Sequence, residues 1–199
     1  MTAQVGCAIL AAGASRRLGQ PKQLLLHRGQ PLVRWAAQCV WQSKAARCAV
    51  VVGAQADAVR AALGALSLEL IDNKEWQEGI ASSIRAAVAW ARDARCAALL
   101  LTLCDQPRLS SAHLDRLLLE HEWCGLAVGS GYGGKQGVPA LFPQAYFEAL
   151  GALRGDSGAS ALLNGEEPVA SVPWPDGELD VDTPDAARHL LRAADYDLP

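Results

Sequence analysis

The sequence predicts an α/β fold in which helices cover both faces of a mostly parallel central sheet. Continuous apolar runs alternate with segments of helical periodicity along the chain. A continuous apolar run is typical of a strand buried on both faces, and strand–helix alternation is typical of parallel crossovers. Ligands of such sheets bind beyond the carboxyl ends of the strands. No internal repeat or linker interrupts the pattern, so we expect residues 1–199 to form a single domain.

The first half of the chain predicts three strands, each followed by a helix. The first run is apolar without a break, and the second ends at Gly53. Pro31 suits the first turn of a helix that continues to Trp41, because the ring fixes φ and the missing N–H has no helical partner there. Gly79, Ser82 and Ser83 precede the third helical pattern. The expected strands are residues 5–11, 48–52 and 68–71, and the expected helices are residues 31–41, 57–63 and 84–91.

The second half continues the alternation less regularly. Its first run is the most apolar of the chain and stops shortly before Asp105. Residues 129–137 hold five glycines, too many for a regular element, so we expect a loop there. The expected strands are residues 97–103, a strand beginning at 126, 139–142 and 169–172; the expected helices are residues 111–121, 144–150, 158–163 and 184–194.

The composition excludes several classes of protein. With 199 residues and 51% hydrophobic side chains, the chain can bury a substantial core. Its formal net charge is -3, which disfavours binding to the many phosphates of a nucleic acid. The N-terminal apolar stretch lacks a basic leader and is too short to span a bilayer, so we expect a cytoplasmic protein with no membrane partner. The six cysteines form no C-x-x-C pair and are expected to be reduced and mostly buried.

The loop after the first strand gathers three cations. Residues 8–25 read AILAAGASRRLGQPKQLL and contain Arg16, Arg17 and Lys22. Backbone N–H groups at a glycine-containing turn favour anions, and cationic side chains strengthen that preference. The segment is neither a P-loop, because Lys22 does not directly follow Gly19, nor a G-x-G-x-x-G turn. The alternative is a solvated turn whose charges aid solubility.

Two aspartates are candidate magnesium ligands. Asp105 follows a buried strand, and Asp182 stands in ELDVDTP near the C-terminus. Mg²⁺ takes oxygen ligands, usually one or two carboxylates together with substrate phosphates. The structural alternative is that Asp182 or Thr183 caps a helix and that Asp105 opens a turn with Pro107.

Together these segments resemble one family. The pattern L-A-A-G-x-S-x-R-x-G-x-x-K at residues 10–22, D-Q-P at 105–107 and D-V-D-T-P at 180–184 resemble the MobA-like nucleotidyltransferases, in particular the molybdenum cofactor cytidylyltransferase branch. The resemblance implies a three-layer, Rossmann-like fold of the nucleotide-diphospho-sugar transferase type. It implies that Asp105 and Asp182 coordinate Mg²⁺, and it assigns Arg16 no role. The nucleotide-binding residues it implies are Leu10, Ala11, Ala12 and Gly13, near the base, with Arg17 and Lys22 on the phosphates.

A second segment extends the resemblance. DNKEWQEGIASSIRAAV at residues 72–88 resembles N-x-x-W-x-x-G-x-x-x-S-[IL] of the same branch. This implies that Asp72 and Asn73 reach the nucleotide from a strand end, and that the hydroxyls of Ser82 and Ser83 meet the ribose or a phosphate. The alternative is that the two serines are helix N-caps.

Two further segments extend the resemblance, and the first of them lies near the second substrate in the family. GYGGKQGVPALF at residues 131–142 carries the G-x-P of the branch, and its glycines would let the backbone approach a pterin. A flexible surface loop would explain the same glycines. GDSGAS at 155–160 resembles G-D-x-G-A-R, with Ser160 where Arg is usual.

The resemblance implies that the chain transfers CMP from CTP to molybdopterin and releases pyrophosphate. Arg17, Lys22 and Asp105 would be the catalytic residues, Mg²⁺ the metal, and a molybdenum hydroxylase or its chaperone a partner. L-A-A-G and D-Q-P favour cytosine, because the guanine-using branch tends to carry L-A-G-G and D-T-P or D-M-P. The alternatives are a guanylyltransferase or another nucleotidyltransferase with a different phosphorylated acceptor, and a non-catalytic cofactor carrier. A dinucleotide-dependent oxidoreductase is disfavoured by the glycine spacing.

Overall fold

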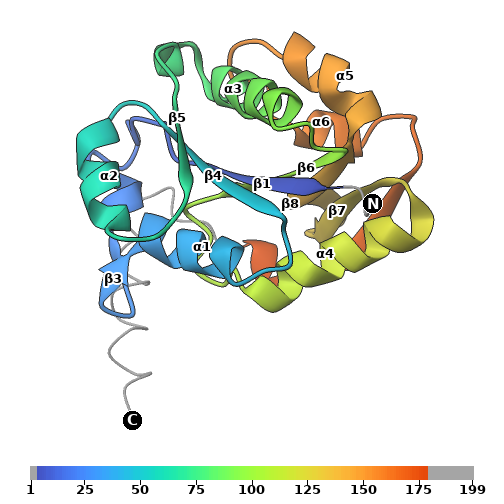
Figure 1. Ribbon diagram of the computed structural model, residues 1–199, viewed down its shortest axis with the longest axis horizontal. Coiled ribbons are helices and arrows are strands. Elements are labelled where there is room, and N and C mark those ends of the chain that lie inside the picture. The colour runs from blue at the N-terminus through green and yellow to red at the C-terminus, as the bar shows by residue number, and fades with distance from the viewer. Residues whose placement is uncertain (1–3, 179–199) are drawn as a thin grey trace.

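A seven-stranded sheet forms the centre of the computed structural model, which describes residues 4–178 (Figure 1). The strand order is β5-β4-β1-β6-β8-β7-β9. Of these strands only β8 runs antiparallel to its neighbours, so the predicted mostly parallel sheet is confirmed. The strands are β1 (Val5–Leu10), β4 (Arg47–Val52), β5 (Glu69–Asp72), β6 (Ala98–Leu103), β7 (Ala127–Tyr132), β8 (Lys135–Pro143) and β9 (Val169–Pro173).

Helices cover both faces of the sheet and give three layers (Figure 1). One face carries α1 (Leu32–Trp41), α2 (Ala56–Leu63) and α4 (Ser111–Cys124), and the other carries α3 (Ile80–Asp93), α5 (Phe147–Ala152) and α6 (Ser160–Leu163). Short elements connect them: β2 (Leu26–His27), β3 (Gln30–Pro31) and the 3₁₀ turns η1 (Lys22–Leu24), η2 (Trp76–Glu78), η3 (Gln144–Tyr146) and η4 (Pro175–Glu178).

Strand β1 shows why the apolar runs form the centre of the sheet. Cys7 and Ile9 pack into the core under α1, α2 and α4, whereas Ala8 and Leu10 pack under α3. Both sets are buried, so every position of the strand must be apolar. No helix among the described residues is long and apolar enough to span a membrane. All six cysteines are free thiols, and Cys48 and Cys124 are only partly buried.

The expected loop at residues 129–137 is wrong. The segment is a hairpin of β7 and β8 that turns at Gly133 and Gly134, whose φ angles are 55° and 71°. The remaining glycines lie in the strands, where they leave room for neighbouring side chains. A Cβ at Gly131, for example, would lie 2.7 Å from Ser171 Oγ on β9. The glycines within the strands therefore fit packing between strands and do not indicate a loop.

The start of one helix and the end of another differ from expectation. Helix α3 begins at Ile80 after Gly79, so Ser82 and Ser83 lie inside its first turn, and the interpretation of these serines as N-caps is wrong. Helix α4 is capped by Ser110, whose hydroxyl accepts a hydrogen bond from the N–H of His113, and it continues beyond the predicted end at residue 121. The predicted helix at 184–194 lies outside the described residues.

A buried histidine ties α4 to the hairpin. His113 Nε2 lies 2.7 Å from Ser130 Oγ, and the Ser130 hydroxyl donates to the carbonyl of Pro139. The imidazole stacks on Trp174, with ring centroids 4.7 Å apart. Burial, with a smaller contribution from the nearby Arg116 charge, lowers the pKa of His113 to about 4. The native protein therefore holds this imidazole neutral.

We expect His113 to make the free energy of unfolding depend on pH. Because its native pKa is below its unfolded value of 6.5, the unfolded chain binds more protons between these values. Stability from this group is complete above pH 6.5 and is lost as the pH falls toward 4. Between pH 7 and pH 5 the loss is about 2 kcal/mol.

The measurement is urea unfolding of the wild type and of His113→Gln at pH 7 and pH 5. Glutamine keeps a donor for Ser130 but does not titrate. The fall in stability between the two pH values should be smaller in the variant by about 2 kcal/mol. An equal fall in both proteins would contradict the role of His113.

Candidate active site

A cleft of about 660 Å³ opens beyond the carboxyl ends of β1 and β6. Its walls come from the loop after β1, from η2 with the start of α3, from the end of β6 and from the loop before α6. The lining residues are Leu10, Ala12, Gly13, Ala14, Ser15, Arg16, Arg17, Leu18, Lys22, Trp76, Gln77, Glu78, Gly79, Ile80, Ser83, Leu103, Asp105 and Asp156. This is the edge at which parallel sheets bind ligands.

The loop after β1 is shaped by one buried amide. Gln23 is only 1% exposed, and its Nε2 donates to the carbonyl oxygens of Ala11 at 3.0 Å and Gly13 at 2.6 Å. Its Oε1 accepts from the hydroxyl of Ser15, and Ser15 Oγ accepts in turn from the N–H of Lys22. These contacts fold the loop back on η1. No role was predicted for Gln23 from the sequence, and only its place directly after the loop pattern at residues 10–22 could have suggested one.

This shape suits an anion. Among the described residues, the backbone N–H groups of Ala12, Gly13 and Ala14 donate no hydrogen bond, and all three residues line the cleft. The side chains of Arg17 and Lys22 reach the same cleft, as does that of Arg16, for which the resemblance gives no role. Open N–H groups beside cations form a site for phosphates. Ala11 does not line it: its N–H donates to the carbonyl of Val51.

Asp105 faces this loop from the end of β6. It is 3% exposed, and one carboxylate oxygen, Oδ2, forms an ion pair with Lys22 Nζ. The other, Oδ1, is buried without a hydrogen-bond partner in the described part of the chain. No backbone N–H among residues 4–178 donates to this carboxylate, as an Asp-initiated turn would require.

The carboxylate fits a divalent cation. A buried oxygen without a donor is rare, and hard cations prefer carboxylate oxygens. Residues 4–178 contain no cluster of three potential metal ligands. Asp105 can thus supply one carboxylate of a divalent-cation site; the other predicted ligand, Asp182, lies outside the described residues.

The structure separates the residues of the 72–83 segment. Ser83 lines the cleft. Asn73 lies behind it, 6% exposed, and its Nδ2 donates to Ser82 Oγ at 2.8 Å and to Ser83 Oγ at 3.0 Å. Asp72 does not line the cleft, and its carboxylate pairs with Arg60 on α2. Asn73 thus holds the two serines in place instead of facing the cleft.

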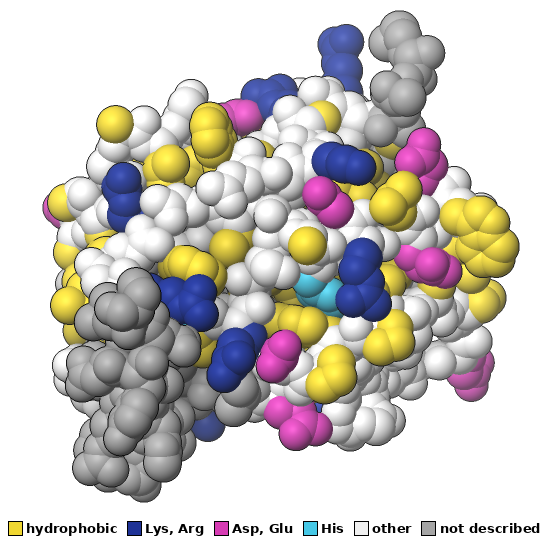
Figure 2. Space-filling view, turned by 90° about the horizontal axis from the view of Figure 1, so that it is seen from below, with side chains coloured by type: hydrophobic (Ala, Val, Ile, Leu, Met, Phe, Trp, Pro, Cys, Tyr) yellow, Lys and Arg dark blue, Asp and Glu magenta, His cyan; other side chains and the backbone are white. Residues whose placement is uncertain are grey.

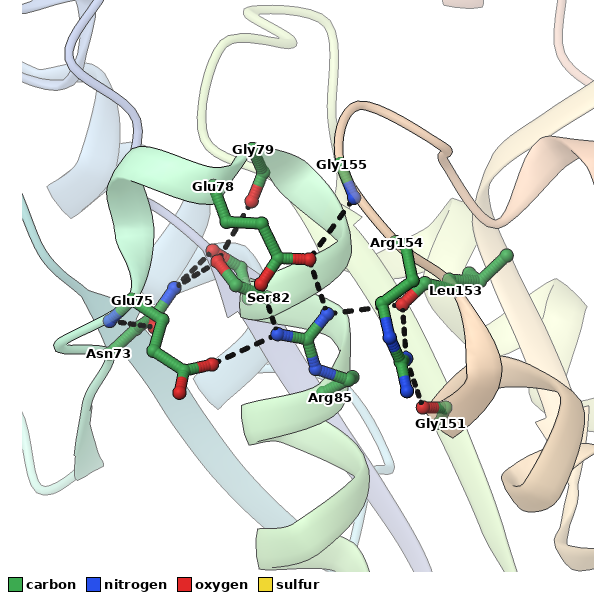
Figure 3. A network of polar contacts seen from close by, with 11 residues as sticks. Asn73, Glu75, Glu78, Gly79, Ser82, Arg85, Gly151, Leu153, Arg154 and Gly155 are labelled. Atoms are coloured by element: carbon green, nitrogen blue, oxygen red, sulfur yellow. Dashed lines mark hydrogen bonds and ion pairs between the residues drawn. The ribbon is translucent and has the colours of Figure 1, made fainter.

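Two groups of lining residues were not identified from the sequence. Trp76, Ile80 and Leu103 give the cleft apolar surface suited to an aromatic ring. Glu78 and Asp156 give it negative charge at the side formed by α3 and the loop before α6. The Glu78 carboxylate is bound by Arg85 and by the N–H of Gly155, and these hydrogen bonds lower its pKa to about 2 (Figure 3).

Figure 2 shows the face of the molecule that carries α1 and α4, seen from below in Figure 1. Among the coloured residues of this face, positive and negative side chains are interspersed with apolar ones. A nucleic-acid interface would instead gather basic side chains.

Comparison with known proteins identifies the family. Residues 7–170 match the MobA-like NTP transferase domain. The chain is 33% identical over 164 residues to nicotine blue oxidoreductase of Paenarthrobacter nicotinovorans, a match covering 78% of this chain and 79% of that protein. The homologue of Mycobacterium tuberculosis Rv0371c from Mycobacterium sp. strain JC1 has a similar structure, with a TM-score of 0.83, 28% identity and coverage of 96% and 97%.

Rv0371c of Mycobacterium tuberculosis H37Rv itself, solved in complex with manganese, gives a TM-score of 0.78 at 30% identity, with 96% of this chain and 99% of that chain covered. The chain belongs to the MobA-like NTP transferase family. The resemblance to the MobA-like family inferred from the sequence is confirmed, and so is the nucleotide-diphospho-sugar transferase type of fold.

We expect Gln23→Leu to loosen the loop after β1. The change leaves the carbonyls of Ala11 and Gly13 without their donor, which should lower the free energy of unfolding by about 1–3 kcal/mol. Urea unfolding measures this loss. Gln30→Leu is the matched control, because Gln30 is only partly buried and its Nε2 bonds just one side chain, Gln38. Equal losses in the two variants would contradict the special role of Gln23.

Proposed function

We propose that this family member transfers CMP from CTP to the phosphate of a molybdopterin-type acceptor, giving the cytosine dinucleotide and pyrophosphate. The observation that carries the proposal is the pairing of an anion-binding loop with a buried carboxylate across one cleft. Open N–H groups and the cations Arg17 and Lys22 lie on one side, and the unpartnered Oδ1 of Asp105 on the other. Enzymes of phosphoryl transfer use such groups to position the reacting phosphates and to neutralise their charge.

The protein's own groups would act mainly by binding and orientation. The loop N–H groups, Arg17 and Lys22 hold the triphosphate and neutralise the charge that develops on the leaving pyrophosphate. Lys22 exchanges its resting partner, Asp105, for phosphate when the nucleotide binds. Asp105 and Asp182 would hold Mg²⁺, which supplies positive charge at the phosphate oxygens. The acceptor phosphate is ionised near neutral pH, so the in-line attack needs neither a general base nor a covalent intermediate.

The choice of CTP rests on the sequence L-A-A-G at residues 10–13 and on D-Q-P at 105–107. Within D-Q-P, the side chain of Gln106 has a structural contact: it is 3% exposed, and its Nε2 donates a hydrogen bond to the carbonyl of Val138. It thereby joins D-Q-P to the G-x-P segment at 137–139. The manganese complex of Rv0371c supports the use of a divalent cation. The protein would act in the cytoplasm and would pass the dinucleotide product to a molybdenum hydroxylase or its chaperone.

A redox activity is the second candidate, because one relative is named an oxidoreductase. The first turn lacks the glycine spacing of a dinucleotide fold, which favours transfer over redox chemistry. The same cleft would also suit three alternative functions. These are guanylyl transfer, nucleotidyl transfer to another phosphorylated acceptor, and non-catalytic binding of the cofactor by a carrier. Lys22 and Asp105 favour an enzyme over the carrier, since a carrier has no use for a triphosphate and its metal.

The deciding experiment measures pyrophosphate release by the purified protein with molybdopterin. CTP, GTP, ATP and UTP are offered in turn with Mg²⁺ or Mn²⁺. Release with CTP alone supports the proposal, and release with GTP alone replaces it with guanylyl transfer. Binding of molybdopterin without release from any nucleotide favours the carrier. Oxidation of NADH or NADPH in a parallel assay would favour the redox activity.

We expect Lys22→Ala to lower kcat/KM for CTP by about 10²-fold or more, because a cation is lost from the phosphate site. Lys44→Ala is the matched control, since Lys44 is exposed and outside the cleft lining. Steady-state pyrophosphate release gives both values. Unchanged turnover in Lys22→Ala would remove the phosphate role.

Asp105→Asn should abolish metal-dependent turnover, a loss of at least about 10²-fold, while the amide keeps the shape of the side chain. A thermal melt of the variant should stay within a few degrees of the wild type, because Lys22 is 22% exposed and can turn toward water. A large fall in melting temperature with retained activity would restore a purely structural role for Asp105.

A further inference from the structure

The cleft has two chemically different sides. Among the described residues, the cations that line it come from the loop after β1, whereas Glu78 and Asp156 lie on the side of α3 and the loop before α6. A phosphate is attracted to the cations, and on the second side it is repelled by the carboxylate of Asp156, since Glu78 is already paired with Arg85. A ligand that spans the cleft must therefore place its anionic group toward Arg17 and Lys22 and a neutral group toward Asp156.

The three carboxylates of the cleft differ in what already binds them. Asp105 pairs with Lys22. Glu78 accepts from Arg85 through both of its oxygens, and its Oε1 also accepts from the N–H of Gly155 at 3.1 Å. Within residues 4–178, Asp156 accepts no hydrogen bond and forms no ion pair, although it lines the cleft. Its carboxylate is available to a ligand.

A network of hydrogen bonds, drawn in Figure 3, fixes the backbone just before the exposed Asp156. Arg85 Nη1 donates to the carbonyl of Leu153 at 3.0 Å while the same guanidinium holds Glu75 and Glu78. A second contact joins the same segments: the N–H of Ala81 in α3 donates a hydrogen bond to the carbonyl of Gly155 at 3.1 Å. The backbone before Asp156 is thus tied to the first turns of α3.

Gly79 completes this support. A Cβ at Gly79 would lie 2.4 Å from both Asp156 Oδ1 and the carbonyl oxygen of Gly155, and its φ of 126° is one that other residues rarely adopt. Only glycine lets the carboxylate lie this close to the start of α3. The position of Asp156 is therefore built by contacts from several elements.

We propose that Asp156 selects the acceptor: its carboxylate accepts two parallel hydrogen bonds from a heterocycle that carries an exocyclic amine beside a ring N–H. The inference rests on the proposed transfer to a pterin and names the residue that recognises it. The two oxygens of a carboxylate match two adjacent N–H donors. The 2-amino-4-oxo edge of a pterin presents this pair. Cytosine does not, because its amine is beside a ring nitrogen that accepts.

The rest of the cleft suits the same ligand. Trp76 and Ile80 line the same cleft as Asp156 and offer apolar surface to a planar ring. With the ring held there, the phosphate of the acceptor points away from the negative side and toward Asp105 and the cations. Asp156 would therefore set both the identity and the direction of the acceptor.

The test compares two pteridines that differ in one group. Pterin carries the 2-amino group, and lumazine carries a carbonyl in its place. Both are fluorescent, so binding to the full chain can be titrated directly, with CTP affinity measured separately by calorimetry. The wild type should prefer pterin to lumazine by about tenfold or more, as expected for hydrogen bonds to a charged group. Asp156→Asn should bring this ratio to about 1 and leave CTP affinity unchanged, because an amide can donate as well as accept.

Three controls separate recognition from general damage. Asp57→Asn removes an exposed carboxylate on α2 and should keep the wild-type ratio. Arg85→Lys should reduce the ratio, because lysine cannot hold Glu78 and Leu153 at once, whereas Arg47→Lys at the surface pair with Glu69 should not. Guanosine carries the same donor edge as pterin and is titrated as well.

Equal binding of pterin and lumazine by the wild type, no binding of either, or an unchanged ratio in Asp156→Asn would overturn the inference. A loss confined to guanosine would assign Asp156 to a nucleotide base and overturn it too. Pyrophosphate release from CTP together with a flat pteridine ratio means that this inference fails alone. A pterin preference that depends on Asp156, without release from any nucleotide, means that the transfer reaction fails while the role of Asp156 stands.

Discussion

The parallel pairing of β1 with β4 and β6 is the constraint on which the rest of the structure depends. Leu10 lies opposite Val51 on one side and Leu103 on the other, so the three strands end at one edge of the sheet. The segments that come directly after β1 and β6 must therefore meet at this edge. They are the cationic loop and Asp105, and the ion pair of Lys22 with Asp105 joins residues 83 positions apart in the sequence. The position of the cleft is therefore a consequence of strand order.

Most of the sheet could be predicted because its signal is local. A strand buried on both faces must be apolar throughout, and the runs that form β1, β4 and β6 show this directly. The β7–β8 hairpin could not be predicted in the same way. Its glycines serve side chains on other strands, such as Ser171, and a single sequence does not show which residues will become neighbours. The same limit explains why Ser82 and Ser83 look like caps when they are buried partners of Asn73.

The candidate site also contains residues that could be predicted from the sequence and residues that could not. Lys22 and Asp105 could be identified because their charges stand out in apolar or glycine-rich surroundings and match a long spaced pattern. The groups that hold the site in shape could not. Gln23 and Arg85 are ordinary polar residues in the sequence, and their importance arises from partners that folding brings to them. Recognition of a family thus finds the groups that meet a ligand more readily than those that position them.

The buried amide of Gln23 has a consequence for the thermodynamics of ligand binding. An unsupported loop of this length would lose conformational entropy when a ligand fixed it, and that loss would be subtracted from the affinity. Here the carbonyls of Ala11 and Gly13 are already fixed by a side chain that is 1% exposed. The ordering cost is met once, when the chain folds, and is not repeated in each catalytic cycle. Part of the stability of the folded protein is in this way converted into affinity for its substrate.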